Sequence, residues 1–395
     1  MLLIDPPNSP GHGRLWSHLA SDTSYDELHR FAASLGIPRR GFDRDHYDIP
    51  AERYDSVVAA GAVPISSREL VSRLHEAGLR RRKGDMLRPR RAGSTLVRGR
   101  RLAAGDTVAV VAPAGPVPPD RLDTGVAVLE SWGLVVRQMP HVRGRHGGYL
   151  AAPDADRAAD LTEAWGDPGV AAVFCARGGY GVHRMVDLLD WDTLAEAGPK
   201  ALVGFSDVTA MHQAFAMRLG ASTIHGPVVT SLGSGDDASR EHLRRLLFAG
   251  TVPPLTPEPV EVLVPGRADG VLVGGNVALL AAGTGTSTYL PAAGSIAVLE
   301  DVDEEPYRLD RMVTHLLRSG WFEGVRGIAL GRFTRCGEQA EVRALLEERL
   351  TPLGVPMLWG VPVGHEDPNL AFPLGLPAVL DADDGTLAVP GRVLR

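Results

Sequence analysis

The sequence predicts an α/β protein with three parts: a parallel sheet flanked by helices that carries a nucleophile, a second mixed α/β subdomain, and a separate small α/β module at the N-terminus. Short apolar runs alternate with helix-like stretches between residues 103 and 250. A Pro-rich stretch, residues 252–259, precedes a second half of mixed strands and helices at 260–395. An Arg-rich segment at 86–102, broken by Pro and Gly, separates the first 85 residues from the remainder.

The N-terminal module, residues 1–85, is expected to hold a strand at 1–4 and helices near 24–35 and 67–77. It is dense in imidazole and carboxylate groups, which suit a divalent metal or a phosphoryl-transfer site. Their spacing matches no known metal motif, and histidines hydrogen-bonded within a small polar core are the alternative reading. The candidate ligands are His12, His18, Asp22 and His46, with Asp5, Asp45 and Asp48 nearby in the sequence.

The segment at 86–102 is predicted to be a basic linker. Residues 1–100 carry a net charge of +5 and the rest a net charge of −12, which gives −7 for the chain. The excess of Arg between residues 80 and 101 could contact a polyanion, but no aromatic residue is interleaved for stacking on bases. A solvated tether is therefore the favoured interpretation, and nucleic acid is not the expected partner.

The region from 103 to 250 has the pattern of a parallel sheet. Right-handed crossovers would bring the carboxyl ends of its strands, and the loops that follow them, to one edge. Expected strands are 107–112, 134–139, 170–174 and 201–205, and expected helices are 122–132, 155–165 and 184–189.

Residues 204–208, Gly-Phe-Ser-Asp-Val, form the most informative motif. They follow the apolar run 201–203, and a helical stripe of apolar residues follows them and ends at Gly220. A serine at a sharp strand-to-helix turn has an exposed hydroxyl, and the next backbone N–H can stabilise an oxyanion. The pattern lacks the last glycine of the usual elbow, so Ser206 and Asp207 could instead be an ordinary helix N-cap.

Three other segments supply what an acyl-transfer site needs. Residues 175–181 contain three glycines that allow backbone N–H groups to approach a ligand. Glu300 ends an apolar run, and His365 follows a turn. A nucleophile, a base and a carboxylate to orient that base would then all lie in loops.

These motifs resemble the LD-carboxypeptidase family of serine peptidases, which also contains the microcin immunity peptidases. The likeness covers about residues 103–392. It is carried by residues 105–113, 149–151, 157–161, 176–181, 204–209, 225–227, 274–276, 299–301, 306–312 and 364–365, in the family's order. The first 85 residues resemble a small family of unknown function, which implies no activity.

The resemblance implies a catalytic triad of Ser206, Glu300 and His365. It places the oxyanion donors at the backbone N–H groups of Asp207 and, in the glycine loop, Gly179. His365 would take the serine proton and Glu300 would hold the imidazole. Several acidic residues crowd the loop after 299, so the choice of Glu300 rests on the motif alone. Candidate substrate contacts are Arg177, Gly178 and Tyr180.

Composition is consistent with a globular enzyme. The chain has 395 residues, 44% of them hydrophobic, and two cysteines, Cys175 and Cys336, which argues against a disulfide scaffold. No stretch has the pattern of a signal peptide or a membrane span, so a cytoplasmic protein without membrane contact is expected. The chemistry requires no cofactor, and the family leads us to expect a homodimer.

The triad alone does not select the substrate. The family resemblance implies release of a terminal D-alanine from a murein tetrapeptide during cell-wall recycling, a small peptide substrate. The alternative is an amide that links an aminoacyl group to a nucleotide-like moiety. Two other classes of function stay open: a metal-dependent phosphoesterase or nuclease led by the N-terminal module, and a peptide-binding protein without catalysis.

Overall fold

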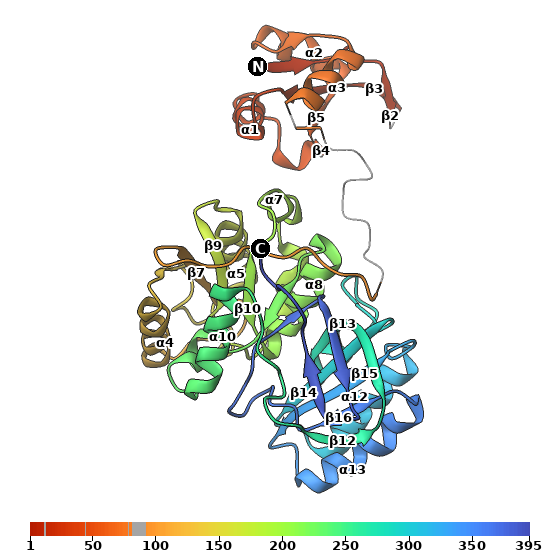
Figure 1. Ribbon diagram of the computed structural model, residues 1–395. Helices are drawn as coiled ribbons and strands as arrows, with labels where there is room; N and C mark the ends of the chain where they lie inside the picture. The colour runs from red at the N-terminus through yellow and green to blue at the C-terminus, as the bar shows by residue number, and fades with distance from the viewer. Residues whose placement is uncertain (12, 44, 78, 81–91) are drawn as a thin grey trace. The chain divides into compact units, whose positions relative to one another are not determined.

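The computed structural model describes all residues except 12, 44, 78 and 81–91. The chain divides into two compact units, Met1–Arg88 and Pro89–Arg395 (Figure 1). Each unit has its own hydrophobic core.

The smaller unit is one sheet with three α-helices among the described residues. The strand order is β4-β5-β3-β1-β6, and β2 pairs with β3. Ser24 and Ser66 cap α1 and α3 by accepting the N–H groups of Glu27 and Glu69, so the helices begin close to the positions that the sequence predicts. The elements are β1 (Leu2–Ile4), β2 (Ser9–Gly11), β3 (Arg14–Ser21), α1 (Tyr25–Ser34), β4 (Phe42–Asp43), β5 (His46–Pro50), α2 (Tyr54–Ala59), β6 (Val63–Pro64) and α3 (Ser67–Glu76).

The first sheet of the larger unit has the order β17-β11-β10-β9-β7-β8. Its strands pair in parallel except for β17, which is antiparallel to β11. The strands are β7 (Thr107–Val111), β8 (Val135–Gln138), β9 (Val170–Cys175), β10 (Ala201–Gly204), β11 (Thr223–His225) and β17 (Phe372–Leu374). The helices are α4 (Pro119–Ser131), α5 (Asp154–Gly166), α6 (Val182–Met185), α7 (Trp191–Glu196), α8 (Thr209–Leu219), α9 (Val229–Leu232) and α10 (Asp237–Ala249).

The second sheet of this unit has the order β12-β16-β15-β14-β13-β18-β19. Strands β13 to β16 pair in parallel, whereas β12, β18 and β19 are antiparallel to their neighbours. The strands are β12 (Glu261–Val264), β13 (Arg267–Asn276), β14 (Ser295–Val302), β15 (Gly327–Thr334), β16 (Met357–Trp359), β18 (Pro377–Asp381) and β19 (Thr386–Ala388). The helices are α11 (Val277–Ala282), α12 (Pro306–Arg318) and α13 (Gln339–Leu350).

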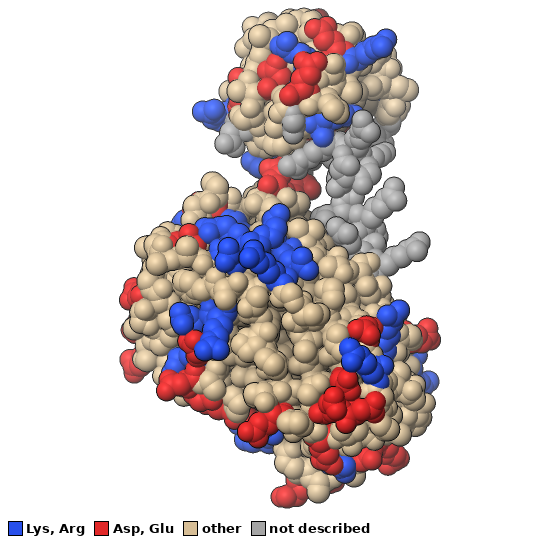
Figure 2. Space-filling model, viewed as in Figure 1, with Lys and Arg blue, Asp and Glu red and all other residues tan. Residues whose placement is uncertain are grey.

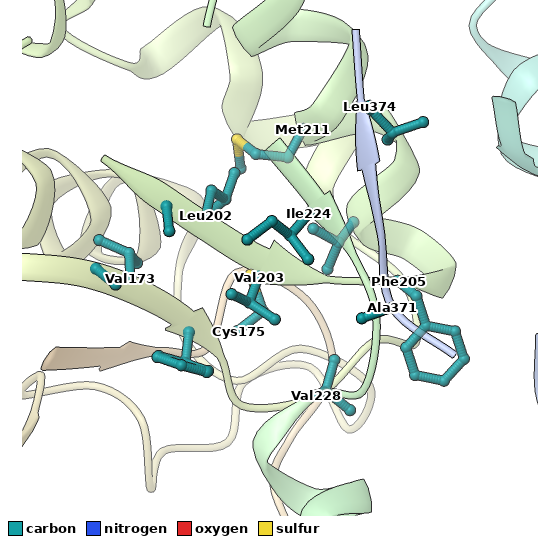
Figure 3. Packing of buried hydrophobic residues seen from close by; sticks show 14 of the residues in the cluster. Val173, Cys175, Leu202, Val203, Phe205, Met211, Ile224, Val228, Ala371 and Leu374 are labelled. Atoms are coloured by element: carbon teal, nitrogen blue, oxygen red, sulfur yellow. The ribbon is translucent and has the colours of Figure 1, made fainter. Parts of the chain in front are cut away.

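The two sheets share a core. Apolar residues of both belong to one buried cluster, which includes Leu202 and Ile224 of the first sheet and Leu272 and Ile296 of the second. Figure 3 shows members of this cluster from the first sheet, among them Val203 and Ile224. Strand β17 comes from the C-terminal half of the chain yet forms the edge of the first sheet, a pairing that the sequence does not reveal. The halves on either side of residues 252–259 are therefore bound together by β17 and by this core.

Two expectations about local structure are wrong. The helix expected at 184–189 begins earlier, as α6, and turns into a short 3-10 helix at Val186–Leu188. Of the linker at 86–102, residues 86–91 lie outside the described residues. The rest is no free tether, because Leu96 and Leu102 are buried and the N–H of Val97 donates to the carbonyl of Gly220.

Two features of the structure concern possible partners: the distribution of charge on its surface and the length of its apolar helices. On the face drawn in Figure 2, the larger unit carries separate patches of basic and acidic side chains. Within the part of the chain that the structure describes, none of the helices combines the length and apolar character required to cross a bilayer.

Candidate active site

The predicted nucleophile lies at a sharp turn. Ser206 follows the end of β10 and has φ of 65°, a left-handed conformation that is costly for a residue with a side chain. A short 3-10 helix at Ser206–Val208 leads directly into α8. This is the strand–turn–helix geometry that exposes a serine hydroxyl in hydrolases.

The glycine loop after β9 lies against this turn. A Cβ atom on Gly178 would come within 2.8 Å of the Ser206 Cβ, so only glycine fits without displacing the serine. Gly179 has φ of 117°, which also favours glycine. The Asp207 carboxylate accepts the N–H of Val182 at 2.8 Å and so ties the elbow to the start of α6. Burial raises the pKa of the Asp207 carboxyl to about 6.

The predicted base and its orienting carboxylate are in contact. His365 Nδ1 lies 2.7 Å from Oε2 of Glu300, a fully buried residue in β14. Gly364 makes this approach possible, because it has φ of 127° and a Cβ there would lie 3.2 Å from the same oxygen.

The two groups shift each other's ionisation. Burial alone would raise the pKa of the Glu300 carboxyl, but the positive charge of His365, with contributions from His225 and from the hydrogen bond of His365, lowers that pKa to about 2. Burial alone would lower the pKa of His365, and the Glu300 carboxylate raises it above its usual value. The pair therefore favours a carboxylate beside an imidazole of increased basicity.

The neighbouring carboxylates are engaged elsewhere. Asp301 accepts hydrogen bonds from the Asn276 side chain and from the N–H of Ala278. Burial and the charge of Glu300 raise the pKa of Asp301 to about 7. Asp303 forms a two-fold ion pair with Arg335. The structure thus distinguishes Glu300 from Asp301 and Asp303, which the chemistry of the sequence does not.

Phe205 connects the serine turn to the histidine. Its ring centroid lies 4.7 Å from that of His365, so the residue before Ser206 packs on the imidazole. Both side chains line a pocket whose wall also includes Pro227, Ser239 and Asn369. The structure therefore brings the three predicted triad segments to one place, at the ends of β10 and β14 and in the loop before β17.

Among the predicted substrate contacts, Gly178 borders Ser206, and the other two side chains are exposed. Arg177 donates from Nη1 to the carbonyl of Pro116 at 2.9 Å, so it anchors the glycine loop to a backbone oxygen. The Tyr180 ring lies 5.8 Å from that of Tyr149. Arg308 contacts the ring and hydroxyl of Tyr307.

Cys175, which directly precedes the glycine loop, is buried, and the described metal candidates of the N-terminal unit have partners of their own. Burial raises the pKa of the Cys175 thiol, which suppresses the reactive thiolate. His12 lies outside the described residues. Asp22 pairs with the N-terminal amino group and with Arg73, so it is engaged away from His18 and His46.

Sequence reasoning missed residues that support the site. His225 Nε2 lies 3.9 Å from the free oxygen of Glu300, and its ring stacks on Phe372 of β17. Thr209 at the start of α8 accepts the N–H of Asn276. In the sequence, His225 is marked only by the stretch 225–227 that carries part of the family resemblance, and that stretch does not indicate what His225 does.

Comparisons with known proteins agree with this architecture. Residues 108–226 match the LD-carboxypeptidase N-terminal domain, residues 269–380 match the LD-carboxypeptidase C-terminal domain, and residues 2–77 match a protein family of unknown function, DUF4031. A "Putative carboxypeptidase" of Streptomyces coelicolor is 53% identical over 74% of this chain and 96% of its own length. The murein tetrapeptide carboxypeptidase of Pseudomonas aeruginosa is 40% identical over 70% of this chain and 93% of its own length.

Solved structures share the fold. Muramoyltetrapeptide carboxypeptidase from Oxalobacter formigenes superposes with a TM-score of 0.64 at 30% identity, over 71% of this chain and 97% of that one. The structure of MccF in complex with glutamyl sulfamoyl guanosine superposes with a TM-score of 0.68 at 22% identity, over 75% of this chain and 99% of that one. At that identity the likeness shows the fold alone. The larger unit therefore makes this chain a member of the LD-carboxypeptidase family of serine peptidases.

Proposed function

We propose that this chain removes the C-terminal D-alanine of a murein tetrapeptide, and that Ser206, His365 and Glu300 are its catalytic triad. The contact between His365 and Glu300 at the end of β14, beside the strained turn of Ser206, is the observation that carries the proposal. The name of the Pseudomonas aeruginosa relative supports the choice of substrate.

The roles follow from which atoms are engaged. Nδ1 of His365 is held by Glu300, which leaves Nε2 to accept the Ser206 proton as Oγ attacks the scissile carbonyl. The oxyanion would receive hydrogen bonds from the backbone N–H groups of Asp207 and Gly179. Protonated His365 then gives its proton to the leaving amine of D-alanine, and water releases the acyl group by the same steps.

Substrate contacts are proposed at the glycine loop. Arg177 and Tyr180 are exposed next to Gly178, whose backbone borders the nucleophile. A free terminal carboxylate is well matched by a guanidinium group. Cytoplasmic cell-wall recycling and a homodimer belong to the same proposal, and both rest on the family.

The alternative substrate class is an aminoacyl group amide-linked to a nucleotide-like moiety. The same triad would cleave it, and the likeness to MccF extends to the fold only. The two classes therefore have to be separated by experiment.

The test is mass spectrometry of L-Ala-γ-D-Glu-meso-diaminopimelate-D-Ala incubated with the full chain. We expect loss of one D-Ala with the wild type and with Ser131→Ala, a control serine at the end of α4, and no loss with Ser206→Ala. The same peptide ending in L-Ala should stay intact. Cleavage of a glutamyl sulfamoyl nucleoside but not of the tetrapeptide would replace the proposed substrate and retain the nucleophile.

A further inference from the structure

The N-terminal unit contains a cluster of imidazole and carboxylate groups that peptide hydrolysis does not use. A ring nitrogen of His18, a ring nitrogen of His46 and a carboxylate oxygen of Asp48 all lie within 4.8 Å of one another. The Asp48 Oδ1 atom is 3.3 Å from His46 Nε2 and 4.0 Å from His18 Nε2. The two rings meet edge to face with their centroids 4.7 Å apart.

The sheet itself sets this arrangement. His18 of β3 is directly opposite Asp48 of β5 in the antiparallel register. His46 precedes Asp48 by two positions on β5, so both side chains project from the same face. Cross-strand partners and alternate residues on one face are the closest neighbours that a sheet provides, and here all three carry groups that can ligate a metal.

A second layer of buried carboxylates orients both rings. Asp5 Oδ2 lies 2.9 Å from His18 Nδ1, and its other oxygen accepts the backbone N–H of His18. Asp45 Oδ1 lies 2.7 Å from His46 Nδ1, and its other oxygen accepts from Arg80. Both aspartates are buried, so each holds the Nδ1–H of its histidine and turns the Nε2 atom toward Asp48. A histidine that binds a metal commonly donates its other ring N–H to a carboxylate in this way.

We propose that His18, His46 and Asp48 form a binding site for a divalent transition-metal ion, with zinc the ion that fits best. Two imidazole nitrogens and one carboxylate oxygen are ligands that zinc takes, whereas magnesium and calcium favour oxygen alone. Tetrahedral zinc with bonds of about 2.0–2.2 Å separates its ligand atoms by about 3.3 Å. The distance from Asp48 to His46 already has this value. His18 would have to move closer, because its Nε2 lies 4.0 Å from Asp48 and the three ligand atoms lie within 4.8 Å of one another.

The site would leave one coordination position open. The three protein ligands are the number found in zinc sites that bind water or substrate in a fourth position. The His18 side chain is 27% exposed and that of Asp48 is 46% exposed, so this position is accessible from solvent. The N-terminal unit would then be a metal-binding module whose chemistry is separate from that of Ser206.

The experiment uses the full chain, freed of any affinity tag and of metal by chelation. Titration with Zn²⁺ by calorimetry should show one site, and Co²⁺ should give the visible absorption bands of tetrahedral coordination. We expect His18→Ala, His46→Ala and Asp48→Asn each to weaken Zn²⁺ binding by about 100-fold or more. Asp5→Asn should weaken it by about 10–100-fold although Asp5 is no ligand, because the orientation of His18 is lost. His75→Ala, which removes an exposed histidine of α3, should change nothing.

Thermal unfolding provides a second readout that does not depend on the His→Ala variants. Zn²⁺ should raise the Tm of the N-terminal transition in the wild type and in His75→Ala, and leave it unchanged in Asp48→Asn. Cleavage of the murein tetrapeptide should be the same with and without chelator and in Asp48→Asn. The proposal would be overturned by equal Zn²⁺ affinity in the wild type and Asp48→Asn, or by the lack of saturable binding in the wild type. The three side chains would then be an ion-paired polar cluster with no metal role.

Discussion

The left-handed backbone of Ser206 has a measurable consequence for stability. An L-residue in this conformation costs about 1–2 kcal/mol, and glycine does not bear that cost. Folding costs about 0.4–1 kcal/mol more for a glycine than for an alanine, because glycine has more conformational freedom in the unfolded chain. Ser206→Gly should therefore be more stable than Ser206→Ala by about 1 kcal/mol, although both variants lack the hydroxyl and should be inactive.

Urea denaturation of the full chain measures this difference. The N-terminal unit is identical in both variants, so only the transition of the larger unit should move. The same pair of substitutions at Ser131, which lies in α4, should show the opposite order, with alanine more stable than glycine by about 0.5 kcal/mol. If Ser206→Gly is no more stable to urea than Ser206→Ala, the inference that the backbone at the nucleophile is strained would be refuted.

Two further changes test the surroundings of the serine. Gly178→Ala places a Cβ 2.8 Å from the Ser206 Cβ, and the resulting displacement should lower kcat by about 10–100-fold, measured as D-alanine release. Glu300→Gln removes the charge that raises the pKa of His365, so the acid limb of the kcat/KM profile should move to lower pH while kcat falls. The direction follows because the base must be neutral to accept the proton.

Matched controls separate these effects from general damage. Gly169→Ala introduces a Cβ whose near contact is the flexible Asp167 side chain, and it should leave kcat unchanged. Glu305→Gln removes an exposed charge just before α12, and its pH profile should match that of the wild type. An acid limb that stays in place in Glu300→Gln would contradict the assigned role of Glu300.

Local pattern was sufficient to predict the serine turn. The apolar run 201–203, the residues Gly204 to Val208 and the stop at Gly220 all encode strand, turn and helix within one stretch of chain. Gly220 does adopt the left-handed conformation that ends a helix, with φ of 57°. The family, which the ordered set of motifs indicates, is confirmed by the comparisons, and so is the α/β fold class, which the alternation of apolar runs and helical stretches indicates.

Long-range contacts could not be predicted in this way. The start of α6 is fixed by the Asp207 carboxylate, which accepts the N–H of Val182 from a distant loop, so periodicity placed that helix wrongly. The pairing of β17 with β11, which stacks His225 on Phe372, joins residues about 150 positions apart. The cluster of His18, His46 and Asp48 depends on strand register, which spacing along the chain does not show.

The most direct measurement is the kinetics of D-alanine release by Ser206→Ala, His365→Ala and the double variant, with the murein tetrapeptide as substrate. If Ser206, His365 and Glu300 act as one unit, each single change should lower kcat by about 10³-fold or more, and the double change should cost little beyond either. Losses that multiply in the double variant would contradict the triad, because they would show that the serine and the histidine act independently.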